Sequence, residues 1–451
     1  DFLSSLYSLS KSKGKTNMHT VAKFGGSSLA DASQIKKVLA IVKSDPARHY
    51  VVVSAPGKRN REDKKITDLL YEWQKLSSLG QSSKDVEKMI SDRYFSIVEG
   101  LGLSLDIKSE LEEISKEISE GASPDYAASR GEYLSGKIVA EALGYEFIDA
   151  AACISSNNGG QDKKADEKLR KLVGNRQVVI PGFYGSMPDG SIKTFSRGGS
   201  DVTGAIVAHA LKAEKYENWT DVCGLRMADP RVVEDPKKIS VVTYRELREL
   251  AYMGANVFHE EAMFPVQEAG IPTHILNTNE PKDSGTVIVA ERKSDKDIRA
   301  ITGIAGRKGF SVLTIEKALM NQEIGFVRKI LTILEQNGVS LEHMPSGIDT
   351  ISIIIDEKKL DGKAEVIVRE IQSECNPDTL EIHPNLAMIA VVGLGMAHVP
   401  GMASRIFTAV AKENINIRMI NQGSSEISIF IGVENTDCEN AIRAIYKAFV
   451  K

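Results

Sequence analysis

The chain of 451 residues is poor in the features that mark several protein classes. Its four cysteines are far apart and form no C-x-x-C pair, which excludes a disulfide framework and a cysteine zinc site and indicates reduced thiols. There is no H-E-x-x-H motif, and no apolar run approaches the roughly 20 residues that cross a membrane. The net charge of -4 gives no electrostatic basis for binding nucleic acid or a membrane surface. We therefore expect a cytoplasmic protein with neither of these partners.

The first large part of the chain alternates between strand-like and helical segments, from Met18 to about Val289. Such alternation predicts an α/β fold with a mainly parallel sheet and helices on both faces. The helix-rich segment 83–123 has no strand signal and is expected to be a lid or an insertion. Residues 1–17 are interpreted as a leader or cloning-derived segment and are left out of the fold prediction. The predicted strands are 20–24, 50–54, 146–149, 177–182, 216–220, 273–276 and 286–289.

The rest of the chain contains an internal repeat with an offset of 76 residues. Shifted by this distance, Gly325 falls on Gly401 and Ile330 on Ile406 without a gap. Each copy reads as strand, turn, helix, strand, turn and strand, which predicts two copies of one small α+β unit. The repeat also accounts for the glycine-rich turn at 391–398, where His398 replaces the third glycine of a dinucleotide fingerprint.

A phosphate-compatible turn is predicted at Lys23-Phe24-Gly25-Gly26-Ser27. A short strand delivers a lysine and two glycines, and a helical pattern opens directly after them. Glycine allows a phosphate to approach the backbone, and the N–H groups at a helix start favour an anion. The lysine precedes the glycines, so this is not a Walker A loop. By itself the motif is also compatible with an ordinary turn.

Four further blocks carry polar groups at element boundaries. Arg197-Gly198-Gly199-Ser200-Asp201 offers an arginine fork for a carboxylate and donors at a helix start. The block from Thr220-Asp221 to Asp229-Pro230-Arg231 places a glycine loop after a strand, where α/β folds bind nucleotides. The last two blocks are Ser129-Arg130-Gly131-Glu132 and Ser54-Ala55-Pro56-Gly57, the latter followed by Thr67 at the next helix start.

In this order, these blocks resemble the aspartate kinases of the amino-acid kinase superfamily, in their stand-alone, lysine-sensitive type. The resemblance covers Met18 to Lys451, and the repeat is similar to the paired ACT regulatory domains of that family. It implies a three-layer sandwich with a mainly parallel sheet over residues 18–295. Two ferredoxin-like α+β ACT domains are expected to follow at 296–385 and 386–451, interleaved or in tandem.

The resemblance implies ATP-dependent phosphorylation of the β-carboxylate of L-aspartate. The product is 4-phospho-L-aspartate, the first intermediate toward lysine, threonine and methionine. Phosphoryl transfer to a carboxylate needs mainly alignment and charge neutralisation, which fits a site without an obvious catalytic histidine. ATP and Mg2+ are the implied cofactors, with Mg2+ on the phosphates and no metal ligand assigned in the chain.

Residue roles follow from the same resemblance. Lys23 bridges the transferring phosphate, and Asp201 orients Lys23 or the substrate amine. Arg197 binds the substrate α-carboxylate, and Glu132 binds the α-ammonium. Ser200 and Thr67 bind the β-carboxylate. The implied phosphate-lining residues are Gly25, Gly26, Ser27 and Ser54, and Phe183 and Gly199 complete the substrate-binding set. The implied ATP contacts are Lys23, Thr220, Asp221, Arg226, Arg231, Asn256 and Val257. Asn256 stands where many relatives have a lysine, and Arg226 where an aromatic residue is common.

The two repeats differ at one informative position, where Glu342 corresponds to Arg418. A carboxylate at the ligand edge of the first copy suits an amino-acid ammonium, and we expect lysine to bind there, alone or with threonine. The expected effector residues are Met320, Glu323, Gly325, Phe326, Val327, Leu341 and Glu342. By resemblance, the ACT units are expected to pair across chains, giving a homodimer or a dimer of dimers.

Two other interpretations remain open from the sequence. One is a kinase of the same superfamily that acts on glutamate, acetylglutamate, carbamate or UMP. The other is an amino-acid-sensing protein with a degenerate kinase domain. Glu132 together with Arg197 favours an α-amino dicarboxylate, and the presence of Lys23, Ser200 and Asp201 together argues against degeneration.

Overall fold

The computed structural model describes residues 19–155, 163–195, 198–255, 258, 260–292 and 299–450. They form two compact units. The first unit takes residues up to 225, 240–244 and 257–291, and the second takes 226–239, 245–256 and the residues from 292 onward. No helix among the described residues is long and apolar enough to span a bilayer.

An eight-stranded sheet forms the centre of the first unit, in the order β3-β4-β2-β1-β7-β9-β10-β8. The neighbours from β3 to β9 pair in parallel, and only β9 and β10 pair antiparallel. The predicted mainly parallel sheet is thus confirmed. The strands are β1 (Thr20–Phe24), β2 (Tyr50–Val53), β3 (Glu146–Phe147), β4 (Val178–Pro181), β7 (Lys215–Thr220), β8 (Val241–Thr243), β9 (Thr273–Asn277) and β10 (Thr286–Val289).

Helices cover both faces of this sheet, as the alternation of side chains along β1 shows. Ala22 and Phe24 join the core formed with α2, α3 and α6, whereas Lys23 points to the opposite face and meets α9. A small hairpin of β5 (Tyr184–Ser186) and β6 (Ile192–Thr194) stands apart from the sheet. The helices of the first unit are α2 (Ala32–Ser44), α3 (Ile66–Ser78), α6 (Pro124–Leu143), α7 (Ala150–Cys153), α8 (Lys163–Val173), α9 (Gly199–Ala210) and α11 (Glu260–Glu268). The helix α10 (Tyr244–Tyr252) belongs, apart from its first residue, to the second unit.

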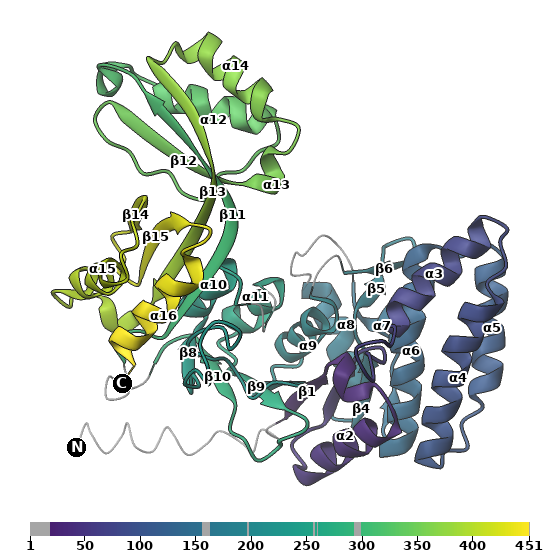
Figure 1. Cartoon of the computed structure of the whole chain (residues 1–451). Coiled ribbons are helices and arrows are strands. Elements are labelled where there is room, and N and C mark those ends of the chain that lie inside the picture. Colours follow the sequence, from purple (N-terminus) through teal and green to yellow (C-terminus); the bar gives the residue numbers. More distant parts are fainter. Residues whose placement is uncertain are drawn as a thin grey trace, which may run out of the picture. The chain divides into compact units, whose positions relative to one another are not determined.

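The predicted helix-rich insertion forms α4 (Lys84–Leu101) and α5 (Ile107–Ser119). These two helices pack with α3 and α6 as a helical layer (Figure 1). Ile107, Leu111, Ile114 and Ile118 are the buried residues of α5, and their spacing of three to four residues produces one apolar stripe. The segment therefore extends the core of the first unit.

Several local features differ from the sequence prediction. The glycine turn after β1 leads into a short 3₁₀ helix, η1 (Gly26–Leu29), and α2 begins only at Ala32, because the Asp31 side chain caps it by accepting the Gln34 N–H. The edge strand β8 was not predicted, since three residues are too few to show an alternating pattern. The helix α8 was also missed, because strongly polar residues dominate its sequence.

The second unit is built on a five-stranded sheet with the order β12-β11-β13-β15-β14. Two long strands, β11 (Gly303–Glu316) and β13 (Thr379–Val392), pair antiparallel along their whole length (Figure 1). The other strands are β12 (Thr350–Asp356), β14 (Met419–Gln422) and β15 (Ser428–Glu434). The helices are η3 (Met320–Gln322), α12 (Phe326–Gln336), α13 (Glu357–Leu360), α14 (Ala364–Cys375), η4 (Leu394–Met396), α15 (Met402–Lys412) and α16 (Cys438–Phe449).

The structure confirms the internal repeat. Both ends of α12 and α15 are offset by 76 residues, and each helix is preceded by a glycine in the left-handed region, Gly325 at φ 83° and Gly401 at φ 86°. The repeats share their central strands: β12 pairs with residues 310–316 of β11, and β15 pairs with residues 386–392 of β13. A register shift at Lys308/Phe310 marks the change from one repeat to the other along β11.

Candidate active site

The candidate site lies where four neighbouring parallel strands end. The register of these strands places their C-terminal residues along one edge of the sheet, and parallel α/β sheets bind ligands at this edge. The loops that follow carry the predicted glycine turn, the Ser54–Gly57 turn, Phe183 and Asp221. The strand-end residues are Phe24 (β1), Val53 (β2), Pro181 (β4) and Thr220 (β7).

Lys23 forms a triangle of polar side chains with Asp201 and Asn218, in which Asp201 is partly buried and the other two are buried. Its ammonium forms a salt bridge with Asp201 at the start of α9 and lies 3.4 Å from Asn218 Oδ1 on β7. The Asn218 amide donates to Asp201 Oδ1 at 2.9 Å, which fixes the carboxylate. Lys23 is thus held in place with its charge close to the strand ends. Asn218 was missed in the sequence, because β7 (Lys-Tyr-Glu-Asn-Trp-Thr) carries several polar residues and none of them stands out as a site residue.

The glycine turns approach each other closely. The Gly57 N–H donates to Gly26 O at 2.8 Å, and a Cβ on Gly57 would lie 2.7 Å from the Gly26 carbonyl carbon. The Gly25 N–H donates to Trp219 O at 2.9 Å, which anchors the first turn to β7. Only glycine permits this backbone approach, so the loops after β1 and β2 form one surface.

The start of α9 contributes Ser200, whose hydroxyl is hydrogen-bonded to that of Ser54 after β2. Gly198 opens this helix at φ 69°, and Gly199 at φ 38° lies against the Phe183 ring. Phe183 itself has φ 75°, and its N–H donates to Thr203 Oγ1 at 3.0 Å. A strained non-glycine backbone that a helix residue fixes in this way is common at functional sites.

Glu132 is a buried carboxylate in the middle of α6, and its Oε2 has no hydrogen-bond partner among the described residues. Burial raises the pKa of Glu132 to about 8, against the opposing effect of a hydrogen bond from the Ala55 backbone. The neighbouring Arg130 stacks on the rings of Tyr126 and Tyr133 and provides no salt bridge to it. An unpaired buried carboxylate is a strong acceptor for an ammonium group.

Thr67 is the second residue of α3 and is half-buried. The Ile66 N–H donates to Pro56 O at 3.3 Å, which places the start of α3 beside the Ser54–Gly57 turn. Asp221 follows β7, and its carboxylate accepts from Thr220 Oγ1 at 3.2 Å. The structure therefore brings these predicted residues to the strand ends.

The structure does not test the positions predicted for the remaining site residues. Arg197, Asn256 and Val257 lie outside the described residues. Arg226 and Arg231 belong to the second unit, where each faces a nearby aspartate, Asp235 at 3.8 Å and Asp229 at 2.6 Å respectively. Their ATP contacts remain predictions.

Comparison with known proteins identifies the family to which this chain belongs. The Amino acid kinase family matches residues 18–277, and the ACT domain family matches residues 389–449. Aspartokinase 3 of Bacillus subtilis is 40% identical over 95% of this chain and 98% of its own length. The chain belongs to the aspartokinase family.

Solved aspartokinase structures agree with this assignment. The aspartate kinase of Clostridium acetobutylicum, described as an allosteric enzyme, is 56% identical with a TM-score of 0.90, over 95% of this chain and 100% of that one. Aspartokinase III of Escherichia coli was solved with aspartate and ADP (25% identity, TM-score 0.75) and with lysine and aspartate (26% identity, TM-score 0.72), each over 96% of this chain and 100% of that one.

The predicted effector residues of this aspartokinase include two glutamates, Glu323 and Glu342, that already pair with lysine side chains of the same chain. Glu323 accepts from Lys317 and from Lys329, the latter at 2.7 Å, and these bonds lower its pKa. The buried Glu342 side chain lies 2.8 Å from Lys359 Nζ and contacts the Tyr252 hydroxyl. Among the other effector residues, Met320 and Phe326 are buried, Val327 and Leu341 are partly buried, and Gly325 opens α12.

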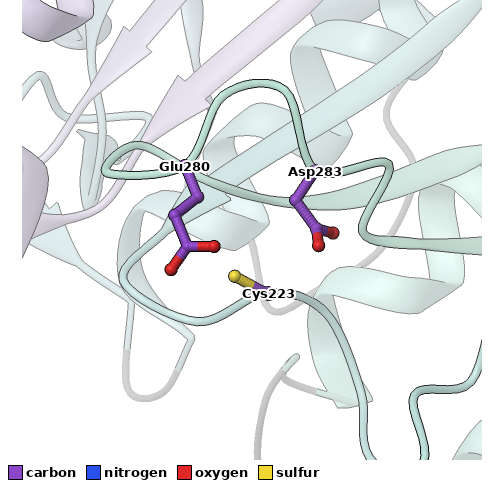
Figure 2. Close-up of side chains that lie close together, drawn as sticks. All are labelled: Cys223, Glu280 and Asp283. Carbon is purple, nitrogen blue, oxygen red and sulfur yellow. The ribbon is translucent and has the colours of Figure 1, made fainter.

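A further cluster of the aspartokinase was not predicted from its sequence. Cys223, Glu280 and Asp283 approach one another from the loop after β7 and the turn between β9 and β10 (Figure 2). The Asn277 amide donates to the Cys223 thiol at 3.1 Å. One thiol with two carboxylates is a poor donor set for Mg2+, which prefers oxygen ligands, so we assign no metal to it.

Proposed function

We propose that this aspartokinase transfers the γ-phosphoryl group of ATP to the β-carboxylate of L-aspartate. A carboxylate oxygen attacks the γ-phosphorus, the bond to the ADP oxygen breaks, and 4-phospho-L-aspartate leaves with ADP. No proton is transferred, because the acceptor carboxylate is ionised at pH 7. This reaction opens the route to lysine, threonine and methionine.

The observation that carries the proposal is the position of Lys23 at the strand ends, held by Asp201 and Asn218 beside the Gly25–Gly26 turn. A preorganised ammonium neutralises the charge that develops on the transferring phosphoryl group. Gly25, Gly26, Ser27 and Ser54 line the phosphates in this proposal. Mg2+ bound together with ATP would supply further charge neutralisation.

Substrate selection depends on Glu132 in this proposal. Its unpaired, buried carboxylate is suited to the α-ammonium of aspartate, while Arg197 takes the α-carboxylate and Ser200 with Thr67 takes the β-carboxylate. An ammonium beside Glu132 would reverse the effect of burial and favour the ionised carboxylate. An acceptor without a free ammonium, such as acetylglutamate, would leave the buried Glu132 carboxyl protonated and without this ion pair.

The test is ADP release by the purified chain with Mg-ATP and one acceptor at a time. We expect turnover with L-aspartate, and at least tenfold lower kcat/KM with glutamate, acetylglutamate, carbamate and UMP. Preference for any of these four would assign another kinase of the superfamily. Amino-acid binding without any ADP release would support the sensing protein instead.

We further propose that lysine inhibits this enzyme by binding the first repeat near Glu342. The lysine complex of the E. coli relative supports this proposal, and so does the buried Glu342 carboxylate in the first repeat.

We also propose that the chain forms a homodimer or a dimer of dimers through the repeats, and that it acts in the cytoplasm. The exposed apolar side chains of Leu319, Ile324 and Ile348 in the first repeat support the dimer.

A further inference from the structure

We propose that Arg93, on α4, is a positioning residue for phosphoryl transfer, because it fixes the two glycine turns of the phosphate site relative to each other. This inference rests on the proposed function. Arg93 belongs to the helical insertion and carries no feature in the sequence that distinguishes it from a surface residue of α4.

The Arg93 guanidinium is buried and binds three separate segments. Its side chain is only 3% exposed. Nη1 donates to Gly57 O at 3.0 Å and to Ala30 O at 3.3 Å, and Nη2 donates to Asp63 Oδ2 at 2.5 Å. It therefore joins the end of η1, the turn after β2 and the loop before α3.

The contact with Gly57 leads directly to the phosphate turn. The Gly57 carbonyl accepts from Arg93, while its N–H donates to Gly26 O at 2.8 Å. The contact with Ala30 fixes the other end of η1, which contains Gly26 and Ser27. Arg93 thus holds both sides of the surface on which the phosphates are proposed to lie.

The Arg93 guanidinium also anchors the loop 58–65 through Asp63. Asp63 accepts from Arg93 and also from the backbone N–H and Nε of Arg59, both at 2.9 Å. The hydrogen bonds from Arg59, together with the charge of Arg93, hold the pKa of Asp63 well below its usual range. The carboxylate stays ionised at working pH, so the anchor does not depend on pH near neutrality.

The same helix also contacts the substrate side of the site. Tyr94, the next residue, donates from its hydroxyl to Gly131 O at 2.8 Å, beside Glu132 on α6. Two adjacent buried polar residues of α4 therefore reach the phosphate turns and the ammonium site. Because a misplacement of about 1 Å can reduce turnover by about 100-fold, this anchoring is expected to matter for catalysis.

The experiment compares Arg93→Gln and Arg93→Lys with Arg48→Gln in the full chain, at a temperature where all variants are folded. Arg48 is a matched control because its side chain is only 11% exposed and binds a carboxylate, Glu217, and a carbonyl, Ile41 O, but it stands before β2 at the opposite end of the strand. Circular dichroism and Tm verify folding, and kcat, KM for Mg-ATP and KM for aspartate are measured.

We expect both Arg93 variants to lower kcat about tenfold or more and to raise KM for Mg-ATP, with KM for aspartate within twofold of the wild type. Lysine cannot reproduce the planar fork, so Arg93→Lys should fail to rescue turnover even where it restores Tm. Arg48→Gln should lower Tm and leave the three kinetic constants unchanged. If Arg93→Gln does not fold, Arg93→Lys decides the question.

The inference is overturned if the Arg93 variants match Arg48→Gln in their kinetics, or if Arg93→Lys restores kcat together with Tm. A wild-type chain without aspartate-dependent ADP release would refute the proposed function before any variant is compared. The two failures are therefore distinguishable in one set of assays.

Discussion

The Lys23 ammonium and the Asp201 carboxylate form a largely buried salt bridge between the central strand β1 and the start of α9. Asn218 completes the arrangement from β7 by donating to the same carboxylate. Three elements that are distant in sequence thereby fix one cation at the edge where the parallel strands end. Breaking such a buried pair leaves an uncompensated charge, so each partner can be tested separately.

Lys23→Ala should reduce kcat by about 100- to 1,000-fold, because it removes the cation that neutralises the transferring phosphoryl group. Asp201→Asn should cause a smaller loss, since Lys23 remains but is no longer held. Lys137→Ala is the matched control: Lys137 is partly buried and pairs with Glu110 on the helical layer, away from the strand ends. Near-normal turnover of Lys23→Ala would refute the role given to this lysine.

Glu132→Gln should change the pH dependence of stability in the absence of substrate. Because burial raises the Glu132 pKa from 4.5 to about 8, the folded state retains a proton that the unfolded state releases. Stability of the wild type should therefore fall as pH rises between these values, and the Gln variant lacks this fall. Calorimetry at pH 5, 7 and 8.5 should show a Tm difference, variant minus wild type, that grows with pH. A constant difference would contradict the assignment.

Glu342→Gln should weaken inhibition by lysine roughly tenfold, through loss of about 1.4 kcal/mol of charge-assisted binding. Glu434→Gln is its control, because Glu434 pairs with Arg418 at the corresponding edge of the second repeat. The measurement is the lysine concentration that halves turnover for both variants and the wild type. Equal sensitivity of the Glu342 variant and the wild type would exclude this effector site.

Lys359→Met should have the opposite effect and make the enzyme more sensitive to lysine. The Lys359 ammonium lies 2.8 Å from Glu342 Oε1, where it occupies the carboxylate proposed for the effector. Removal of this internal competitor frees Glu342 Oε1 for the free amino acid, while Tyr252 and Arg307 still face Oε2. The same inhibition curves test the prediction, and reduced sensitivity would show that Lys359 supports the effector site instead.

Much of the fold could be predicted because its pattern is local. The β1, β2 and β9 strands show apolar runs bounded by turn residues, and the repeat is visible as a fixed offset of 76 residues. The short β8 and the polar α8 lack such patterns. The division of residues 226–256 between two units was also not predictable, since it depends on packing partners distant in sequence.

The site residues that lie together in a sequence motif could be predicted. Isolated residues that contact the site from elements distant in sequence could not. Lys23, Ser200 and Asp201 belong to glycine-containing blocks that mark strand–helix junctions. Asn218 and Arg93 are isolated residues in a strand and a helix, and only the three-dimensional contacts show their partners. Composition and periodicity do not report such contacts.

The most direct measurement is the identification of the phosphorylated product. The purified chain is incubated with Mg-ATP, L-aspartate and hydroxylamine, which converts an acyl phosphate into a stable hydroxamate. The account predicts aspartate β-hydroxamate in an amount equal to the ADP released, and about 100- to 1,000-fold slower hydroxamate formation with the Lys23→Ala variant. ADP release without the hydroxamate, or a hydroxamate formed equally from glutamate, would contradict it.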